Sequence, residues 1–155
     1  MSSLISRRRL LLASLTAALP GVLWAAADKT LVEVWKSPYC GCCKDWISYL
    51  ESSGFAVRTH EVQDLDAARR RLGMPERFAS CHTAKVAGYL LEGHVPAREI
   101  QRLLKEKPAA LGIAVPGMPV GSPGMDGPAY GGRCDPFDVL LVSRDGRAAV
   151  FSSYR

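Results

Sequence analysis

A chain of 155 residues, of which 48% are hydrophobic and 23% are charged, is long enough to form one domain around an apolar core. Its formal net charge is +5, but residues 1–27, which we expect to be removed, hold three of the twenty basic residues and none of the fifteen acidic ones. The remaining segment has a net charge of +2, which argues against a nucleic-acid-binding surface.

Residues 1–27 have the pattern of a secretory signal peptide. A basic start, an apolar run and a small-residue end follow one another: Arg7–Arg9, Leu10–Leu19 and Ala25–Ala27. The arginines also resemble a twin-arginine export signal, and the general export pathway is the alternative. We expect cleavage near Ala27, a single exported domain over residues 28–155, and no membrane span after cleavage.

The exported segment predicts an α/β fold. Alternating apolar and β-branched residues predict strands, and apolar residues spaced three or four apart predict helices. In chain order the predicted elements are a strand Leu31–Trp35, a helix Gly41–Ser53, a strand Phe55–Val62, a helix Leu65–Leu72, two short strands within Ala84–Leu91 and a helix Pro96–Lys105. The order β-α-β-α-β-β-α, with cysteines in the first strand-to-helix turn, is typical of the thioredoxin-like arrangement.

The second predicted helix has a clear start and a clear inward face. Asp64 is a good N-cap, and Leu65, Ala68 and Leu72 share one face of the helix. We expect the run Arg69–Arg71 to lie on the solvated face of the same helix.

Residues 108–137 differ from the rest, with six prolines and seven glycines in thirty residues. This content excludes a continuous helix or strand and predicts a long ordered loop or lid. The segment repeats Pro-Gly-Met, which places Met118 and Met125 seven residues apart. Beyond it, Asp138–Val142 and Arg147–Phe151 predict a terminal hairpin.

Three cysteines stand at the start of the first helix, in the sequence Cys40-Gly-Cys-Cys43. In a thioredoxin-like fold Cys40 and Cys43 would be a redox dithiol, with Cys43 on the inward face and Cys40 near the cap. Cys42 departs from that scheme, because a third thiol would compete in disulfide exchange. As a ligand of a soft metal it has a role, since thiolates select Cu(I) or Zn(II). A plain disulfide with a spare thiol is the alternative.

A fourth thiol, Cys81, lies in the loop that enters the third strand, and in thioredoxin-like proteins this loop packs against the dithiol. Four converging sulfurs close a tetrahedral zinc site or bridge several Cu(I) ions. His82 and His94 are candidate additional ligands, and a structural role is the alternative for each. Met118 and Met125 are likewise either soft ligands for Cu(I) or anchors of the loop.

Several long motifs in matching order make the chain recognisable. They are Cys40-Gly-Cys-Cys43, Ser80-Cys-His-Thr83, Glu92-Gly-His-Val-Pro96, Val115-Pro-Gly-Met-Pro-Val-Gly-Ser-Pro-Gly-Met125 and Phe137-Asp-Val-Leu-Leu141. Together these motifs resemble the CopG family of periplasmic copper-resistance proteins. The resemblance covers nearly the whole exported segment. It implies a thioredoxin-like fold, a periplasmic location and a cysteine-bridged copper cluster with a role in interconverting Cu(I) and Cu(II).

Carried over by position, the resemblance implies that Cys40, Cys42, Cys43 and Cys81 hold the copper. Cys134 departs from the family pattern, and we interpret it as an incidental free thiol; the alternatives are a disulfide partner for another chain or an extra ligand brought in by the loop. We therefore expect a protein that contributes to copper resistance by sequestration, redox conversion or both. The alternatives are a thiol-disulfide oxidoreductase with Cys40 and Cys43 as catalytic residues, a chaperone that passes Cu(I) to another periplasmic copper-handling protein, and a structural zinc site.

Overall fold

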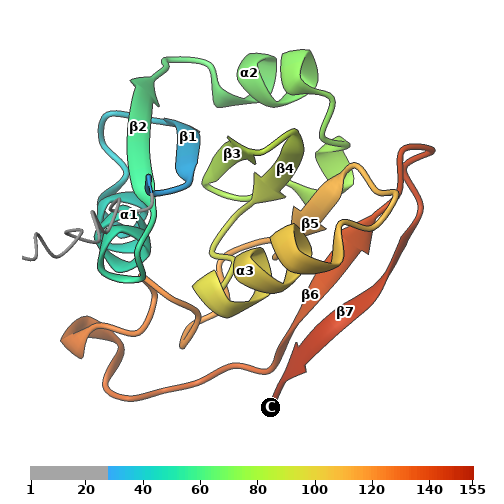
Figure 1. Cartoon of the computed structure of the whole chain (residues 1–155). Coiled ribbons are helices and arrows are strands. Elements are labelled where there is room, and N and C mark those ends of the chain that lie inside the picture. Colours follow the sequence, from blue (N-terminus) through green and yellow to red (C-terminus); the bar gives the residue numbers. More distant parts are fainter. Residues whose placement is uncertain (1–27) are drawn as a thin grey trace, which may run out of the picture.

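The structure is a computed structural model that describes residues 28–155. The predicted signal peptide, with its cleavage site near Ala27, lies outside the described residues. The helices and strands of residues 28–155 are, in chain order (Figure 1), β1 (Leu31–Lys36), α1 (Gly41–Ser52), β2 (Ala56–Glu61), α2 (Leu65–Leu72), the 3-10 helix η1 (Glu76–Phe78), β3 (His82–Val86), β4 (Tyr89–Glu92), α3 (Ala97–Glu106), β5 (Gly112–Ala114), the 3-10 helix η2 (Pro128–Tyr130), β6 (Phe137–Val142) and β7 (Ala148–Tyr154).

The seven strands of the described segment form one sheet, in the order β2-β1-β3-β4-β5-β6-β7. β1 runs parallel to β2, and β4 runs parallel to β5. The other neighbouring strands are antiparallel. The mixed α/β class is therefore confirmed, and the elements from β1 to α3 follow the predicted order.

The glycine-rich segment 108–137 contains a strand that the prediction of a loop did not include. This strand, β5, pairs with β4 on one side and with β6 on the other. Gly112 permits the close pairing, because a Cβ at this position would lie 2.6 Å from the carbonyl carbon of Leu90. β5 therefore connects the predicted terminal hairpin, which is β6 and β7, to the main sheet.

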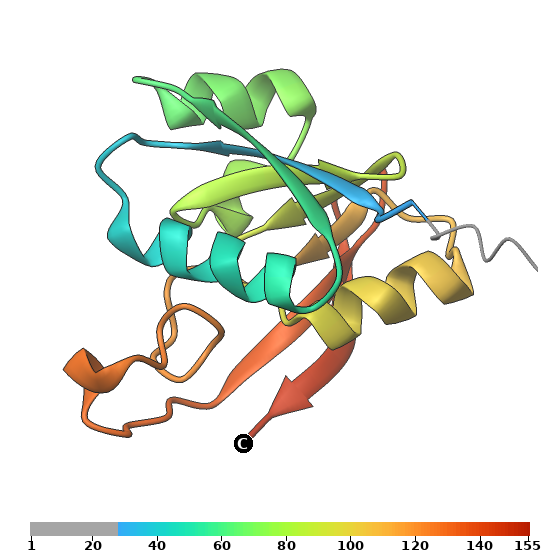
Figure 2. The same ribbon diagram turned by 60° about the vertical axis from the view of Figure 1, so that its left-hand side comes forward.

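Helices cover both faces of the sheet, with α1 and α3 on one face and α2 on the other (Figure 2). Trp46 of α1 and Ile100 of α3 belong to the larger apolar cluster, and Phe78 of η1 belongs to a smaller one. Leu91 faces the larger cluster and Leu90 the smaller, because successive side chains of a strand point to opposite faces. The sheet is thus packed on two sides, as expected for an α/β domain.

Arg69 contradicts the prediction that the arginine run of α2 is solvated. Its side chain is only 2% exposed, whereas Arg70 and Arg71 are exposed. Arg69 stands four residues after Leu65, so the helical period places it on the inward face of α2. There the buried carboxylate of Glu92 accepts a hydrogen bond from its guanidinium, which compensates for the loss of water around the charge.

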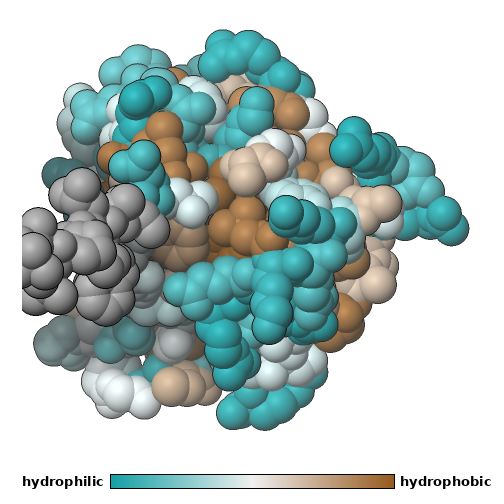
Figure 3. All heavy atoms as spheres, in the orientation of Figure 1, coloured by the Kyte–Doolittle hydropathy of each residue, from teal (hydrophilic) through white to brown (hydrophobic). Residues whose placement is uncertain are grey.

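None of the helices in residues 28–155 has the length and apolarity needed to cross a membrane. Figure 3 shows hydrophilic residues over most of the face seen in Figure 1, with an apolar area near its middle.

Candidate metal centre

The turn between β1 and α1 carries three cysteines. Cys40 is the N-cap of α1, and Cys42 and Cys43 lie in its first turn. The N–H of Cys40 donates to the carbonyl of Ser37 at 3.2 Å, which closes the turn. Cys43 is fully buried on the inward face with Trp46, as predicted, and Cys42 is half-buried. The free N–H groups of a helix start favour negative charge at this point.

Cys40 and Cys43 form a disulfide, with their Cα atoms 5.4 Å apart. Cys42 remains a free thiol, and its Sγ lies 3.6 Å from the Sγ of Cys40. In this state Cys40 and Cys43 are unable to act as thiolate ligands. A site made of four thiolates therefore requires reduction of this bond.

Cys81 reaches the same place from the loop before β3. β3 pairs with β1 so that His82 stands opposite Lys36, the last residue of β1, which brings Cys81 beside the start of α1. Its Sγ lies 3.8 Å from the Sγ of Cys42, and its carbonyl oxygen lies 3.3 Å from the Sγ of Cys43. The structure thus brings together the four cysteines that the sequence singles out, with sulfur atoms within 4.8 Å of one another. Their role as ligands stays a prediction.

His94 also lies beside Cys81, in the connection between β4 and α3. Its Nε2 is 2.9 Å from the Sγ of Cys81, and its Nδ1 is 2.8 Å from the carbonyl oxygen of Pro123. Because a carbonyl only accepts, Nδ1 is assigned the proton, and Nε2 presents its lone pair to the sulfur. A hydrogen bond on the distal nitrogen is the usual way in which proteins orient a metal-binding histidine.

His82 completes a second group of candidate ligands with Cys81 and His94, whose donor atoms lie within 4.8 Å of one another. It is fully buried, with its ring 4.2 Å from that of Trp46. Its Nδ1 lies 3.4 Å from the Sγ of Cys81, and its Nε2 has no hydrogen-bond partner among residues 28–155. Burial, with repulsion from His94 as a smaller cause, lowers the pKa of His82 well below its usual value, so the ring is neutral.

Burial also controls the protonation of Cys81. It raises the pKa of this thiol to about 12, and the neighbouring Cys42 adds to the effect. Burial lowers the pKa of His94. At neutral pH the metal-free site therefore holds a protonated Cys81 between neutral imidazoles, and a metal cation bound there displaces the thiol proton.

The loop over residues 115–127 packs directly against the start of α1. A Cβ on Gly124 would lie 2.7 Å from the backbone nitrogen of Trp46 and 2.8 Å from the carbonyl oxygen of Cys42. Gly124 also has a φ of +82°, which favours glycine. Its neighbour Pro123 is the residue that contacts His94. The predicted lid thus touches both the helix start and the histidine.

Met118 and Met125 occupy different environments in this loop. Met125 is 8% exposed, and its sulfur accepts a hydrogen bond from the hydroxyl of Tyr130 at 3.2 Å. Met118 is 52% exposed. Met125 therefore has the surroundings of a loop anchor, whereas Met118 is accessible from solvent.

Cys134 lies apart from the four clustered cysteines. It is exposed and packs beside Gly121, where a Cβ would lie 2.9 Å from its sulfur. It belongs to neither group of candidate ligands found in the described segment. This location agrees with the interpretation of an incidental thiol.

Sequence reasoning missed a buried ion pair next to Cys81. Arg69 donates from Nε to Oε1 of Glu92 at 2.9 Å, and the N–H of Ser80 donates to the same oxygen at 2.7 Å. Desolvation raises the pKa of Glu92 to about 7, although the charge of Arg69 acts in the opposite direction. The residue that precedes Cys81 is therefore bonded to a buried carboxylate.

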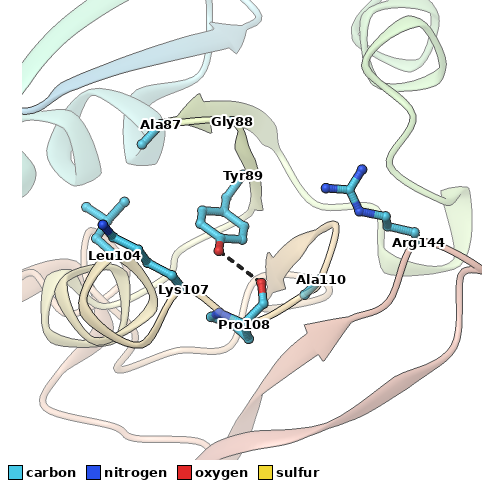
Figure 4. A pocket seen from close by; sticks show the side chains of 8 residues that line it. All are labelled: Ala87, Gly88, Tyr89, Leu104, Lys107, Pro108, Ala110 and Arg144. Carbon is cyan, nitrogen blue, oxygen red and sulfur yellow. Dashed lines mark hydrogen bonds between the residues drawn. The ribbon is translucent and has the colours of Figure 1, made fainter.

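A cavity of about 430 Å³ lies elsewhere, between the turn that joins β3 to β4, the end of α3 and the turn before β7 (Figure 4). The hydroxyl of Tyr89 donates to the carbonyl of Pro108 at 2.9 Å, and Lys107 and Arg144 lie on opposite sides of the Tyr89 ring. The described residues that line it include no cysteine, histidine or methionine. It is therefore separate from the candidate metal centre.

Comparison with known proteins finds two similar solved structures, titled copper resistance protein copG, Form 2 and Form 1. The first is 44% identical, with a TM-score of 0.77, and the match covers 83% of this chain and 100% of that chain. The second is 45% identical, with a TM-score of 0.75, and covers 82% and 98%. A family described as a protein of unknown function, DUF411, matches residues 78–125. A search of curated proteins finds no match.

Proposed function

The chain belongs to the CopG family of copper resistance proteins, and on that premise we propose that it binds copper through Cys40, Cys42, Cys43 and Cys81. One observation carries the proposal, namely the convergence of four sulfur atoms within 4.8 Å from two separate segments of the chain. Thiolates are soft ligands that favour Cu(I). Sulfurs this close can bridge ions, so the group suits more than one Cu(I).

The four cysteines have different parts in this proposal. Cys42 and Cys81 offer free thiols, and Cys40 and Cys43 join them once two electrons and two protons have reduced the disulfide. In the reverse direction, oxidation of Cys40 and Cys43 to the disulfide releases two electrons and two protons, enough to convert two Cu(II) to two Cu(I). In this proposal the protein contributes to copper resistance by sequestering Cu(I), and the same cysteines interconvert Cu(I) and Cu(II).

His82 and His94 supply nitrogen ligands beside Cys81 in the proposed site. His94 is held by Pro123 with Nε2 toward the sulfur, and the Nε2 of His82 is buried without a partner in the described segment. Met118, which is exposed on the loop, is an auxiliary ligand for incoming Cu(I).

We also propose a thioredoxin-like core and a periplasmic location. The strand order β2-β1-β3-β4 supports the first, with β2 parallel and β3 antiparallel to β1 and the cysteine motif at the start of α1. The disulfide supports an oxidising compartment. Residues 1–27 then act as the export signal.

A second candidate function is thiol-disulfide exchange by Cys40 and Cys43. The disulfide between them favours it, because this bond is the oxidised form of a Cys-x-x-Cys dithiol. Under this alternative, Cys42 and Cys81 are dispensable for activity.

Metal analysis combined with a thiol count tests the copper proposal. The exported protein is prepared without oxygen, reduced, loaded with copper and desalted. We expect more than one Cu(I) per chain, and retention of copper over zinc when both are supplied. One copper or none per chain, or retention of zinc alone, would contradict the proposal.

A further inference from the structure

Ser80, the residue before Cys81, has both of its backbone groups held by a buried ion pair. Its N–H donates to Oε1 of Glu92 at 2.7 Å, and its carbonyl accepts from Nη2 of Arg69 at 2.7 Å. Arg69 and Glu92 are joined by a 2.9 Å hydrogen bond, and their side chains are 2% and 0% exposed. Because the ion pair lies in a low-dielectric interior, the hydrogen bonds that it makes are stronger than they would be in water.

The ion pair connects three elements that are separate in the sequence. Arg69 belongs to α2, Glu92 ends β4, and Ser80 lies in the loop that leads into β3. Ser80 is also confined from its other side, because its hydroxyl donates to the carbonyl of Gly117. A Cβ at Gly93 would lie 2.7 Å from the Cβ of Ser80. Ser80 therefore has little room to shift.

Cys81 depends on this confinement more than the other clustered cysteines do. Cys40, Cys42 and Cys43 are placed by the cap and first turn of α1, whereas Cys81 is placed by the pairing of β3 with β1 on one side and by the loop that holds Ser80 on the other. Its sulfur lies 3.8 Å from that of Cys42. A displacement of about 1 Å at a reacting group is enough to change its function by about 100-fold.

We propose that Arg69 and Glu92 are positioning residues, which hold Cys81 at the distance from Cys42 that a shared metal site requires. The use of this geometry for copper rests on the proposed function, but the geometry itself is testable without metal. A buried ion pair contributes little net stability, because desolvation offsets the attraction between the charges. The presence of a buried ion pair at this place is therefore better explained by its hydrogen bonds to the Ser80 loop than by a gain in folding stability.

The main test variant removes both members of the ion pair, so that no unpaired buried charge is left. Arg69→Met/Glu92→Leu replaces both partners with apolar residues, a change that folded proteins commonly tolerate. Glu92→Gln keeps an acceptor for Ser80 but weakens the bond to Arg69. Glu99→Gln is the matched control, because Glu99 of α3 is also buried and accepts from Arg98 and Tyr154.

The first measurement is made on metal-free protein with the Cys40–Cys43 disulfide intact. Diamide oxidises Cys42 and Cys81 to a disulfide and is itself reduced to the hydrazine, and peptide mass analysis follows the new bond. We expect the rate to fall about tenfold or more in the double variant, to fall less in Glu92→Gln and to stay unchanged in Glu99→Gln.

A wild-type rate in the folded double variant overturns the proposal. If the double variant does not fold, the test rests on Glu92→Gln. In that case, a rate of Cys42–Cys81 disulfide formation equal to that of Glu99→Gln overturns the proposal.

Copper affinity provides the second measurement, by competition between reduced protein and a Cu(I) chelator. Loss of groups that orient metal ligands lowers affinity roughly 10- to 100-fold, and we expect this loss in the double variant but not in Glu99→Gln. If wild-type protein binds no copper, the proposed function is contradicted but the positioning role of Arg69 and Glu92 is not, because the diamide reaction still reports the position of Cys81.

Discussion

The Nε2 of His94 lies 2.9 Å from the Sγ of Cys81, while its Nδ1 lies 2.8 Å from the carbonyl oxygen of Pro123. One imidazole therefore links the cysteine cluster to the loop over residues 115–127. Burial lowers the pKa of His94, so the neutral ring accepts a hydrogen bond from the Cys81 thiol. The helix start, the loop and the cysteine cluster form one unit, and a change in one of them is expected to affect the others.

Cys42→Ser is expected to reduce copper loading sharply while the Cys40–Cys43 disulfide still forms. The substitution removes the sulfur that lies near both Cys40, at 3.6 Å, and Cys81, at 3.8 Å. Copper per chain is measured after loading under reducing conditions, and disulfide formation by a thiol count after reoxidation.

Cys134→Ser is the control for this variant, because Cys134 is exposed and outside both candidate groups. We expect it to load copper like the wild type. Unchanged loading in Cys42→Ser would instead favour thiol-disulfide exchange as the function.

Cys81 is expected to react slowly with iodoacetamide in the metal-free protein. The thiolate is the reactive form, and burial together with Cys42 raises the pKa of Cys81 to about 12. A raised pKa leaves a small thiolate fraction at pH 8, so the rate should rise about tenfold per pH unit toward pH 12. Peptide mass analysis measures the rate between about pH 7 and pH 10, with exposed Cys134 as the internal reference for reagent loss. A Cys81 rate that levels off below about pH 9 would show that this thiol ionises more easily.

Gly124→Ala is expected to destabilise the protein by about 1–3 kcal/mol, because the new Cβ collides with the backbone at Trp46 and Cys42. Gly127→Ala is the matched control in the same loop, since a Cβ there meets nothing within 4 Å. Its effect should stay within about 0.5 kcal/mol. Urea unfolding of both variants measures the difference. Equal stability of the two would mean that the loop does not rest on α1 in solution.

Met125→Ala is expected to cost about 2 kcal/mol or more, because it empties a buried position. Met118→Ala should change stability by less than about 0.5 kcal/mol, since Met118 is 52% exposed. Thermal unfolding distinguishes the two variants, and copper competition shows whether Met118→Ala weakens metal binding at unchanged stability. A similar loss of stability in both would contradict the different roles assigned to the two methionines.

Elements that depend on local patterns were predictable from the sequence. Asp64 caps α2 as expected, by accepting the N–H of Ala67 at 2.8 Å. The three-residue strand β5 was not predictable, because its formation depends on β4 and β6 on either side of it. The charge of Arg69 predicts a solvated position, whereas its place four residues after Leu65 indicates the inward face of α2, and the structure shows the latter.

The sequence by itself determined the cysteine cluster at the start of α1, because Cys40, Cys42 and Cys43 are spaced within one helical turn and a turn forms from local backbone bonds. Only the tertiary structure decided what surrounds Cys81. Cys81 and His94, which are in contact, lie 13 positions apart in the sequence. Arg69 and Ser80, which are joined by a hydrogen bond, lie 11 positions apart. Such contacts exist only when the strands and helices are packed, since no local pattern encodes the distance between them.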